Sequence, residues 1–128
     1  MITAVHSLIY SDDPDATRAF LRDVLGWDHV EHRESGDGWL IFKTGPSELG
    51  VHPTAGEWQG ERYEQPRHHL LSLMCDDLDA TIDDLRGRGA TFSSEPVVQG
   101  FGRTILLDVP GADPLMLYEP SHPTAFDR

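Results

Sequence analysis

The sequence repeats itself at an offset of 64 residues, and this repeat constrains the fold more than any other feature. The segment DDPDATRAFLR at 12–22 aligns with DDLDATIDDLR at 76–86, and seven of the eleven positions are identical. Each copy follows an apolar run, at 4–11 and at 68–75. Repetition at a fixed offset is the signature of a duplicated structural unit. We therefore expect two copies of one unit in this chain.

Both copies open with residues that suit the start of a helix. Asp13 and Asp77 are predicted N-caps, because a short carboxylate side chain can accept a hydrogen bond from the free backbone N–H groups of the first turn. Pro14 fits the first helical position, where no N–H is needed. Gly26 follows the first apolar face and can end that helix in a left-handed conformation.

Each predicted helix is followed by three short runs that are typical of strands, separated by turn residues. The runs lie at 27–33, 39–44 and 48–52 in the first half and at 90–99, 103–109 and 115–119 in the second. Each half therefore reads βαβββ. The predicted fold class is α+β, with two such modules in a pseudo-two-fold arrangement that leaves a concave cleft between their sheets.

The chain length predicts a single domain, because one core of this size suits a chain of 128 residues. The expected parts are module one at 1–53, a linker at 54–66, module two at 67–120 and a tail at 121–128.

Composition excludes several classes of partner. The net charge of −12 would repel phosphate backbones and anionic lipid, so neither nucleic acid nor a membrane is expected as a partner. The N-terminal residues lack the pattern of a secretory leader, and we expect a cytoplasmic protein. Cys75 is the only cysteine and alternates with Leu71 and Leu73, which favours a small buried apolar residue.

Over 2–120 the chain resembles the vicinal oxygen chelate superfamily, which includes glyoxalase I, bleomycin resistance proteins, extradiol dioxygenases and fosfomycin resistance proteins. The resemblance rests on the paired modules, His6 in the first run, FLRDVLGW at 20–27, CDDLDAT at 75–81 and LYEP at 117–120. It implies a glyoxalase-like fold, a small-molecule ligand in the cleft and a homodimer.

The resemblance also implies a divalent metal, Zn, Ni, Mn or Fe, held by one residue from the first strand and one from the last strand of each module. His6 matches the first of these positions. The other three are occupied by Leu70, Met116 and Leu49, none of which is a ligand for such an ion.

Two interpretations remain open. In the first, the metal site is degenerate and the protein binds a small molecule in a cleft whose candidate lining residues are Leu49, Leu70, Met116 and Trp39. In the second, strand bulges re-aim side chains and the protein is a metal-dependent lyase or dioxygenase. The shifted metal ligands would then be His6, His52, His69 and Glu119. No catalytic residue is assigned, and no cofactor other than a metal is expected.

Overall fold

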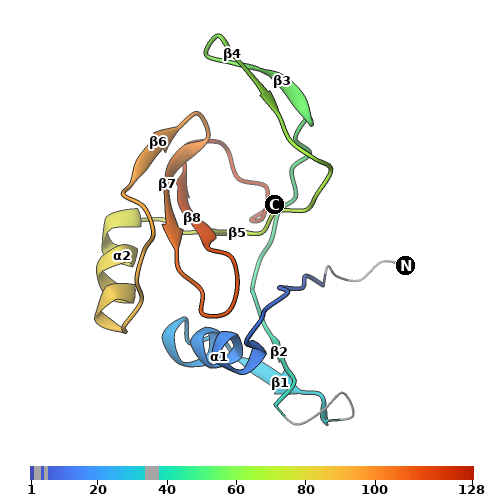
Figure 1. Cartoon of the computed structure of the whole chain (residues 1–128), viewed down its shortest axis with the longest axis vertical. Helices are drawn as coiled ribbons and strands as arrows, with labels where there is room; N and C mark the ends of the chain where they lie inside the picture. The colour runs from blue at the N-terminus through green and yellow to red at the C-terminus, as the bar shows by residue number, and fades with distance from the viewer. Residues whose placement is uncertain (2–3, 5, 34–37) are drawn as a thin grey trace.

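The computed structural model describes residues 1, 4, 6–33 and 38–128, and its largest element is a four-stranded sheet in the second half of the chain. The strands follow the spatial order β5 (Ser72–Met74), β8 (Leu115–Pro120), β7 (Gly102–Leu107) and β6 (Val97–Gln99). β5 runs parallel to β8, and the other two pairings are antiparallel. Helix α2 (Leu78–Gly87) covers one face of this sheet (Figure 1).

The period of two in β7 and β8 decides which face the helix covers. In β8, Leu115 and Leu117 are buried and Met116 between them is more exposed; in β7, Ile105 and Leu107 are buried and Leu106 between them is exposed. Thr104 of β7, on the opposite face from Ile105, is also buried. The buried apolar set packs with the apolar stripe of α2, which lies at the three- and four-residue spacing of one helix face. The sheet thus has a helix-covered face and a helix-free face. The residues of the core between sheet and helix are Ile105, Leu107, Leu115, Leu117, Leu78, Ile82 and Leu85.

Both predicted helix starts are confirmed. Asp13 accepts a hydrogen bond from the N–H of Ala16 at 3.2 Å, and Asp77 accepts one from the N–H of Ala80 at 3.0 Å. The first helix, α1 (Pro14–Ala19), continues as a π-helical turn, η1 (Phe20–Val24). The side chain of Phe20 is buried in the core that α2 and the sheet share. Across the described residues, no helix is long and apolar enough to cross a bilayer.

Helix α2 is capped a second time from the sheet. Oε1 of Glu119, at the end of β8, accepts a hydrogen bond from the N–H of Leu78 at 3.1 Å. Beside it, Arg103 of β7 donates to Asp79 in the first helical turn at 2.9 Å, which holds the pKa of the Asp79 carboxyl below its usual value. Two of the free N–H groups at the start of α2 therefore have carboxylate acceptors: Asp77 for Ala80 and Glu119 for Leu78.

The first half of the chain is less complete. Strands β1 (His29–Glu31) and β2 (Leu40–Phe42) form an antiparallel pair. The two predicted outer strands, at 4–11 and 48–52, are not strands in the described part of these ranges. Leu8 and Val51, which lie in them, are 61% and 93% exposed. The mixed α+β class is confirmed, but the described strands complete only the second module, because the outer runs of the first find no neighbouring strand within the chain.

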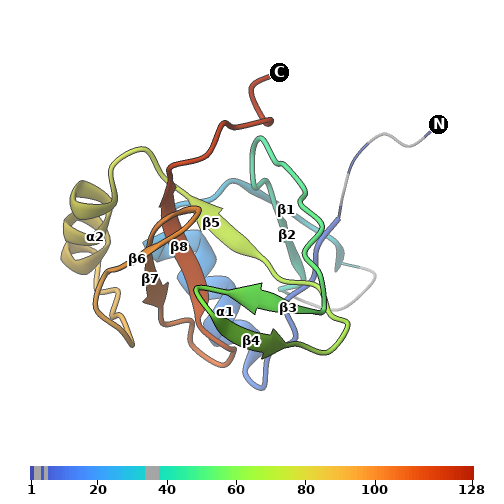
Figure 2. The same ribbon diagram turned by 90° about the horizontal axis from the view of Figure 1, so that it is seen from above.

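The predicted linker contains a regular hairpin. β3 (Ala55–Trp58) pairs with β4 (Glu61–Glu64) around a two-residue turn. Figures 1 and 2 both place this hairpin on the side of the sheet away from α2. The hairpin is therefore on the same side of the sheet as the helix-free face.

The core assignment predicts a contrast between two neighbouring leucines of β7. Leu107 is fully buried, whereas Leu106 is 40% exposed on the opposite face. Replacing Leu107 by alanine should lower the free energy of unfolding by about 2–5 kcal/mol, because a buried cavity is left. Leu106→Ala should cost about 1 kcal/mol or less. Urea denaturation followed by circular dichroism measures both, and equal losses would show that the helix-covered face is assigned wrongly.

The second cap predicts a distinction between two substitutions of Glu119. Glu119→Ala removes the acceptor for the Leu78 N–H and should cost about 0.5–2 kcal/mol of unfolding free energy. Glu119→Gln keeps a side-chain oxygen in place and should cost only a few tenths of a kcal/mol. The same denaturation experiment, done on protein treated with a chelator, tests this. Equal losses of unfolding free energy in the two variants would contradict the capping role.

Candidate functional site

The helix-free face of the sheet is mostly apolar. Its register follows from the pairing of β8, in which Met116 lies opposite Leu106 of β7 and Ser72 of β5. Partners that lie directly opposite one another point to the same side of a sheet. Tyr118 follows two residues after Met116 and therefore shares this face. The ladder thus brings together a thioether, a leucine and a phenol on the side that no helix covers.

Aromatic rings extend this face at the turn between β6 and β7. The ring of Phe101 meets that of Tyr118 edge to face, with 5.4 Å between centroids. The Tyr118 hydroxyl lies 3.2 Å from Nε2 of His122. Since Nδ1 of His122 lies 2.7 Å from the carbonyl oxygen of Pro123, it is the nitrogen that carries the proton. In the neutral imidazole with its proton on Nδ1, the Tyr118 hydroxyl is the donor to Nε2.

Glu48 joins the first half of the chain to this cluster. Its Oε2 accepts a hydrogen bond from the N–H of Ala125 at 2.6 Å, and its Oε1 lies 3.8 Å from Nε2 of His122. Partial burial, together with the nearby Glu48 carboxylate, raises the pKa of Tyr118 above its usual value. The phenol is neutral near pH 7, so its hydroxyl can donate one hydrogen bond and accept another.

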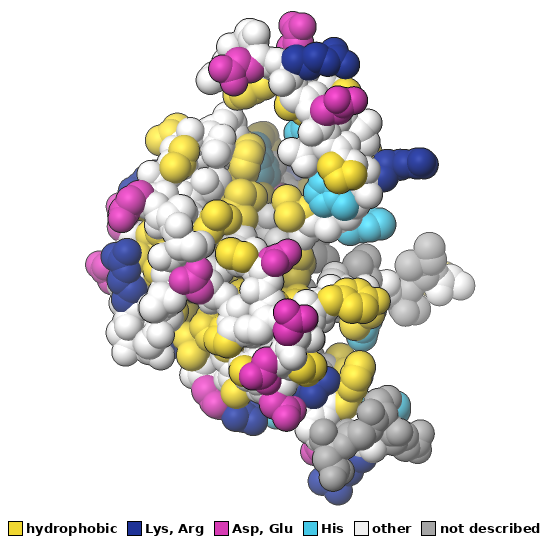
Figure 3. Space-filling view, in the orientation of Figure 1, with side chains coloured by type: hydrophobic (Ala, Val, Ile, Leu, Met, Phe, Trp, Pro, Cys, Tyr) yellow, Lys and Arg dark blue, Asp and Glu magenta, His cyan; other side chains and the backbone are white. Residues whose placement is uncertain are grey.

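The space-filling view shows apolar side chains at the surface on one side of the molecule (Figure 3). Hydrophobic side chains form a band over the middle of the face shown in Figure 3, and histidine side chains lie to its right. Exposed apolar residues that neighbour one another, unlike scattered ones, mark binding surfaces.

The four predicted metal ligands lie apart from one another. Glu119 is on the helix-covered side, where it caps α2. His6 and His69 are exposed, and His69 falls in the alternation of Leu71 and Leu73, which pack against the core. β5 pairs with β8 without a bulge, so its own ladder does not re-aim His69.

His52 is engaged locally. Its Nδ1 lies 2.7 Å from the carbonyl oxygen of Pro53, and its ring meets that of Tyr63 at 5.5 Å between centroids. Among the described residues, no three His, Cys, Asp or Glu side chains gather into a group that could hold a metal ion. The shifted ligand set is therefore not assembled within the described part of a single chain.

Of the four predicted lining residues, Met116 and Leu70 lie at the four-stranded sheet, and Leu49 and Trp39 lie in the first half of the chain. Met116 is half-buried on the helix-free face, and Leu70, two residues before Ser72, is 74% exposed at the start of the same run. Leu49 is 80% exposed in the open segment of the first half. Trp39 lies elsewhere, with the guanidinium of Arg18 over its ring at 4.9 Å.

Sequence reasoning missed Tyr118, Phe101, His122 and Glu48. The signal for Tyr118 was available, because it lies two residues from Met116 in an alternating strand. Glu48 contacts the tail at His122, which lies 74 positions later in the sequence. No local sequence pattern indicates a contact over that separation.

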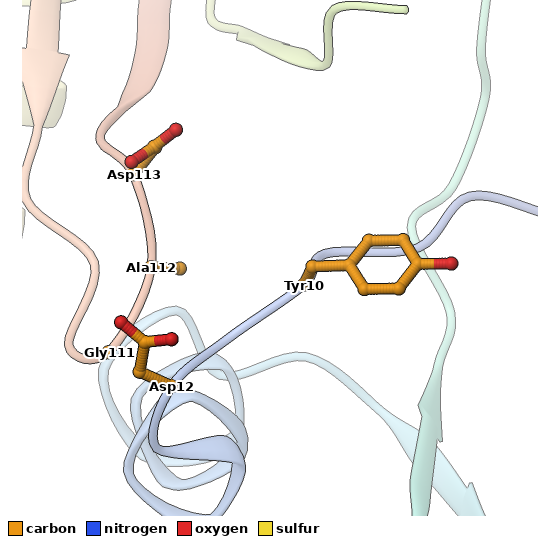
Figure 4. Close-up of a pocket in the computed structure, with 5 residues that line it drawn as sticks. All are labelled: Tyr10, Asp12, Gly111, Ala112 and Asp113. Carbon is orange, nitrogen blue, oxygen red and sulfur yellow. The ribbon is translucent and has the colours of Figure 1, made fainter.

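The described residues also form two shallow depressions, the second of which includes Met74, the β5 partner of Tyr118 on this face. The first, of about 380 Å³, is lined by Tyr10, Asp12 and the 111–113 loop; in Figure 4 the ring of Tyr10 points away from the two carboxylates of Asp12 and Asp113. The second, of about 450 Å³, lies beneath the tail and is lined in part by Cys75 and Phe126. Burial raises the pKa of the Cys75 thiol, so it is a poor nucleophile at neutral pH.

Solved structures share this fold. An antibiotic binding protein from Streptomyces sp. CB03234, TnmS3, matches at a TM-score of 0.58 and 19% identity, covering 94% of this chain and 98% of its own. Lactoylglutathione lyase from Agrobacterium tumefaciens matches at 0.55 and 18%, covering 92% and 94%. The fosfomycin resistance protein FosX from Listeria monocytogenes matches at 0.55 and 16%, covering 94% of each chain.

A search of curated protein sequences finds no match. A family model does match, over residues 3–120, which is nearly the whole chain. This agrees with the second-half sheet and with the helix starts described above. The chain belongs to the Glyoxalase/Bleomycin resistance protein/Dioxygenase superfamily.

Proposed function

We propose that this protein binds an apolar or aromatic small molecule on the helix-free face of its four-stranded sheet. The observation that carries the proposal is the chemistry of that face, which Met116 and Leu106 share with Tyr118, whose ring contacts Phe101. Ligand sites in proteins are typically apolar surfaces with a few placed polar groups. The Tyr118 hydroxyl, oriented by His122, is such a group.

Two structural relatives support a binding role. One is described as an antibiotic binding protein and another as a fosfomycin resistance protein. Both share the fold at low sequence identity, so they support the class of function and do not identify the ligand.

We further propose that the protein works as a homodimer. A compact monomer of 14.3 kDa exposes about 6,800 Å² of surface. This chain exposes 9765 Å², an excess of roughly 3,000 Å². Interfaces of obligate homodimers bury roughly 2,000–5,000 Å² in total. Because that total is shared by two chains, such an interface would cover about 1,000–2,500 Å² of each, which is a substantial part of the excess.

Some of the exposed surface is apolar and lies in segments that form no strand. Tyr10, Leu49, Val51 and Leu70 are each more than 70% exposed, which is unusual for large apolar side chains in a folded monomer. β5 has a partner strand on one edge only among the described strands. A free strand edge beside exposed apolar segments favours pairing with another chain. We therefore place the second copy against 4–11, 47–53 and β5.

The dimer can be tested by mass. Light scattering at micromolar concentration should give about twice the 14.3 kDa of one chain. Val51→Asp should shift the mass to that of a monomer, because a charge buried without a partner opposes association. Val98, also highly exposed at 80% but on the outer strand β6, provides the control, and Val98→Asp should remain dimeric. A wild-type monomer, or equal effects of both variants, would contradict this interface.

The alternative, a metal-dependent lyase or dioxygenase, needs a second chain to bring its ligands together. His6 and His52 lie on the open segments of the first half that a second copy would cover. In a dimer these imidazoles could meet metal ligands from the second chain, since they do not gather with others among the described residues of one chain.

Ligand binding by chelator-treated protein separates the two functions. We expect wild-type dimer to bind the planar cation proflavine, followed by its fluorescence anisotropy, with the same affinity before and after treatment. Met116→Asp should weaken binding by at least about tenfold, since it places a carboxylate within an apolar site. Val98→Asp should bind as wild type does. If one equivalent of metal per chain is found, and if its loss or His6→Ala abolishes binding, the metal-dependent alternative is correct.

A further inference from the structure

The hairpin formed by β3 and β4 is a preformed arm. Its two turn residues, Gln59 and Gly60, both have positive φ, at 52° and 80°. This is the geometry of the tightest hairpin turn, whose twist matches that of the two strands. The arm is closed at its base by a hydrogen bond of 2.7 Å from the N–H of Gln65 to the carbonyl oxygen of Thr54. It can therefore move as one body.

The arm is also braced by its own side chains. The ring of Tyr63 lies across Gly56, where an added Cβ would stand 2.7 Å from the Tyr63 hydroxyl oxygen. The other side of the base is held by the edge contact between Tyr63 and His52. The stiffness of the arm thus does not depend on the sheet.

At its tip, the arm rests on Gly100, in the turn between β6 and β7. The indole of Trp58 lies so close to Gly100 that an added Cβ would stand 2.7 Å from two of the ring atoms. Gly100 does not have a left-handed backbone, so its φ does not require glycine. The missing side chain is explained by the space that the indole occupies. More than half of the Trp58 surface, 57%, nevertheless remains exposed.

The seat of Trp58 adjoins the proposed ligand face. Gly100 is followed directly by Phe101, whose ring contacts Tyr118. Both views of the ribbon place the arm on the side of the sheet away from α2 (Figures 1 and 2). A ligand on the helix-free face would therefore have the indole at one end and the rings of Phe101 and Tyr118 beside it.

We infer that Trp58 is a gate residue, which rests on Gly100 when the face is empty and stacks on a planar aromatic ligand when it is occupied. This inference rests on the proposed binding function and adds to it a ligand class and a moving part. A flat ring can enter between the indole and the turn because the arm is rigid and Gly100 offers no side chain to hold it. Stacked aromatic rings are a favoured arrangement for such a ligand.

The empty state can be tested without any ligand. Gly100→Ala should unseat the indole, because the new methyl group occupies its position. Trypsin cleavage after Arg62 in β4 should then be at least about fivefold faster, and acrylamide should quench Trp58 more strongly. The Trp58 signal is the difference between each protein and its Trp58→Phe counterpart. The control is Gly87→Ala, at a glycine with no neighbouring atom within 4 Å.

The occupied state is tested with proflavine on the wild-type assembly. Trp58→Ala should weaken binding by at least about tenfold, whereas Trp58→Phe, which keeps an aromatic face, should weaken it by less than about threefold. Trp27→Phe, at a ring that packs against Phe42, should bind as wild type does. Anisotropy titration measures all three.

Each result decides the inference. If Gly100→Ala behaves as Gly87→Ala, the inference that Trp58 rests on Gly100 in the empty state is wrong. If Trp58→Ala binds proflavine as tightly as wild type while Met116→Asp does not bind, the gate is wrong and the proposed function stands. If wild type itself fails to bind proflavine, the proposed ligand class and the gate are overturned together, whatever the unliganded variants show.

Discussion

The packing of α2 on one face of the four-stranded sheet determines most of what this protein can do. Because strand residues alternate, burying Leu115 and Leu117 beneath the helix commits Met116 and Tyr118 to the opposite face. The same commitment turns Glu119 toward the helix N-terminus, where it serves as a cap. A single hydrophobic contact layer thus separates the residues that hold the fold from those free to meet a ligand.

The repeat predicted the helices well because a helix start is a local event. Asp13 and Asp77 cap their helices with hydrogen bonds that span three residues, and the sequence contains both partners. The second module was equally predictable, because its strands pair within one continuous segment. The linker hairpin was missed, although Trp58 and Tyr63 flanking Gln59-Gly60 are typical of a turn between strands. Its polar composition had favoured a loop.

The two copies of the repeat differ in what surrounds them, and this limited the prediction of the site. In the second copy, the strand before the helix pairs with β8, but the corresponding first-half segment has no partner strand among the described residues. Strand pairing depends on a distant neighbour, which a local pattern cannot supply. For the same reason, the contact of Glu48 with His122 and Ala125 could not be foreseen, while the position of Tyr118 followed from alternation.

The parallel pairing of β5 with β8 has a consequence for how the chain is made. In the sequence, β5 is followed directly by α2. Its partner strand β8, which brings Leu115 and Leu117 to the core, is synthesised about forty residues after β5. During translation, at roughly 5–20 residues per second, the apolar face of α2 therefore remains uncovered for several seconds.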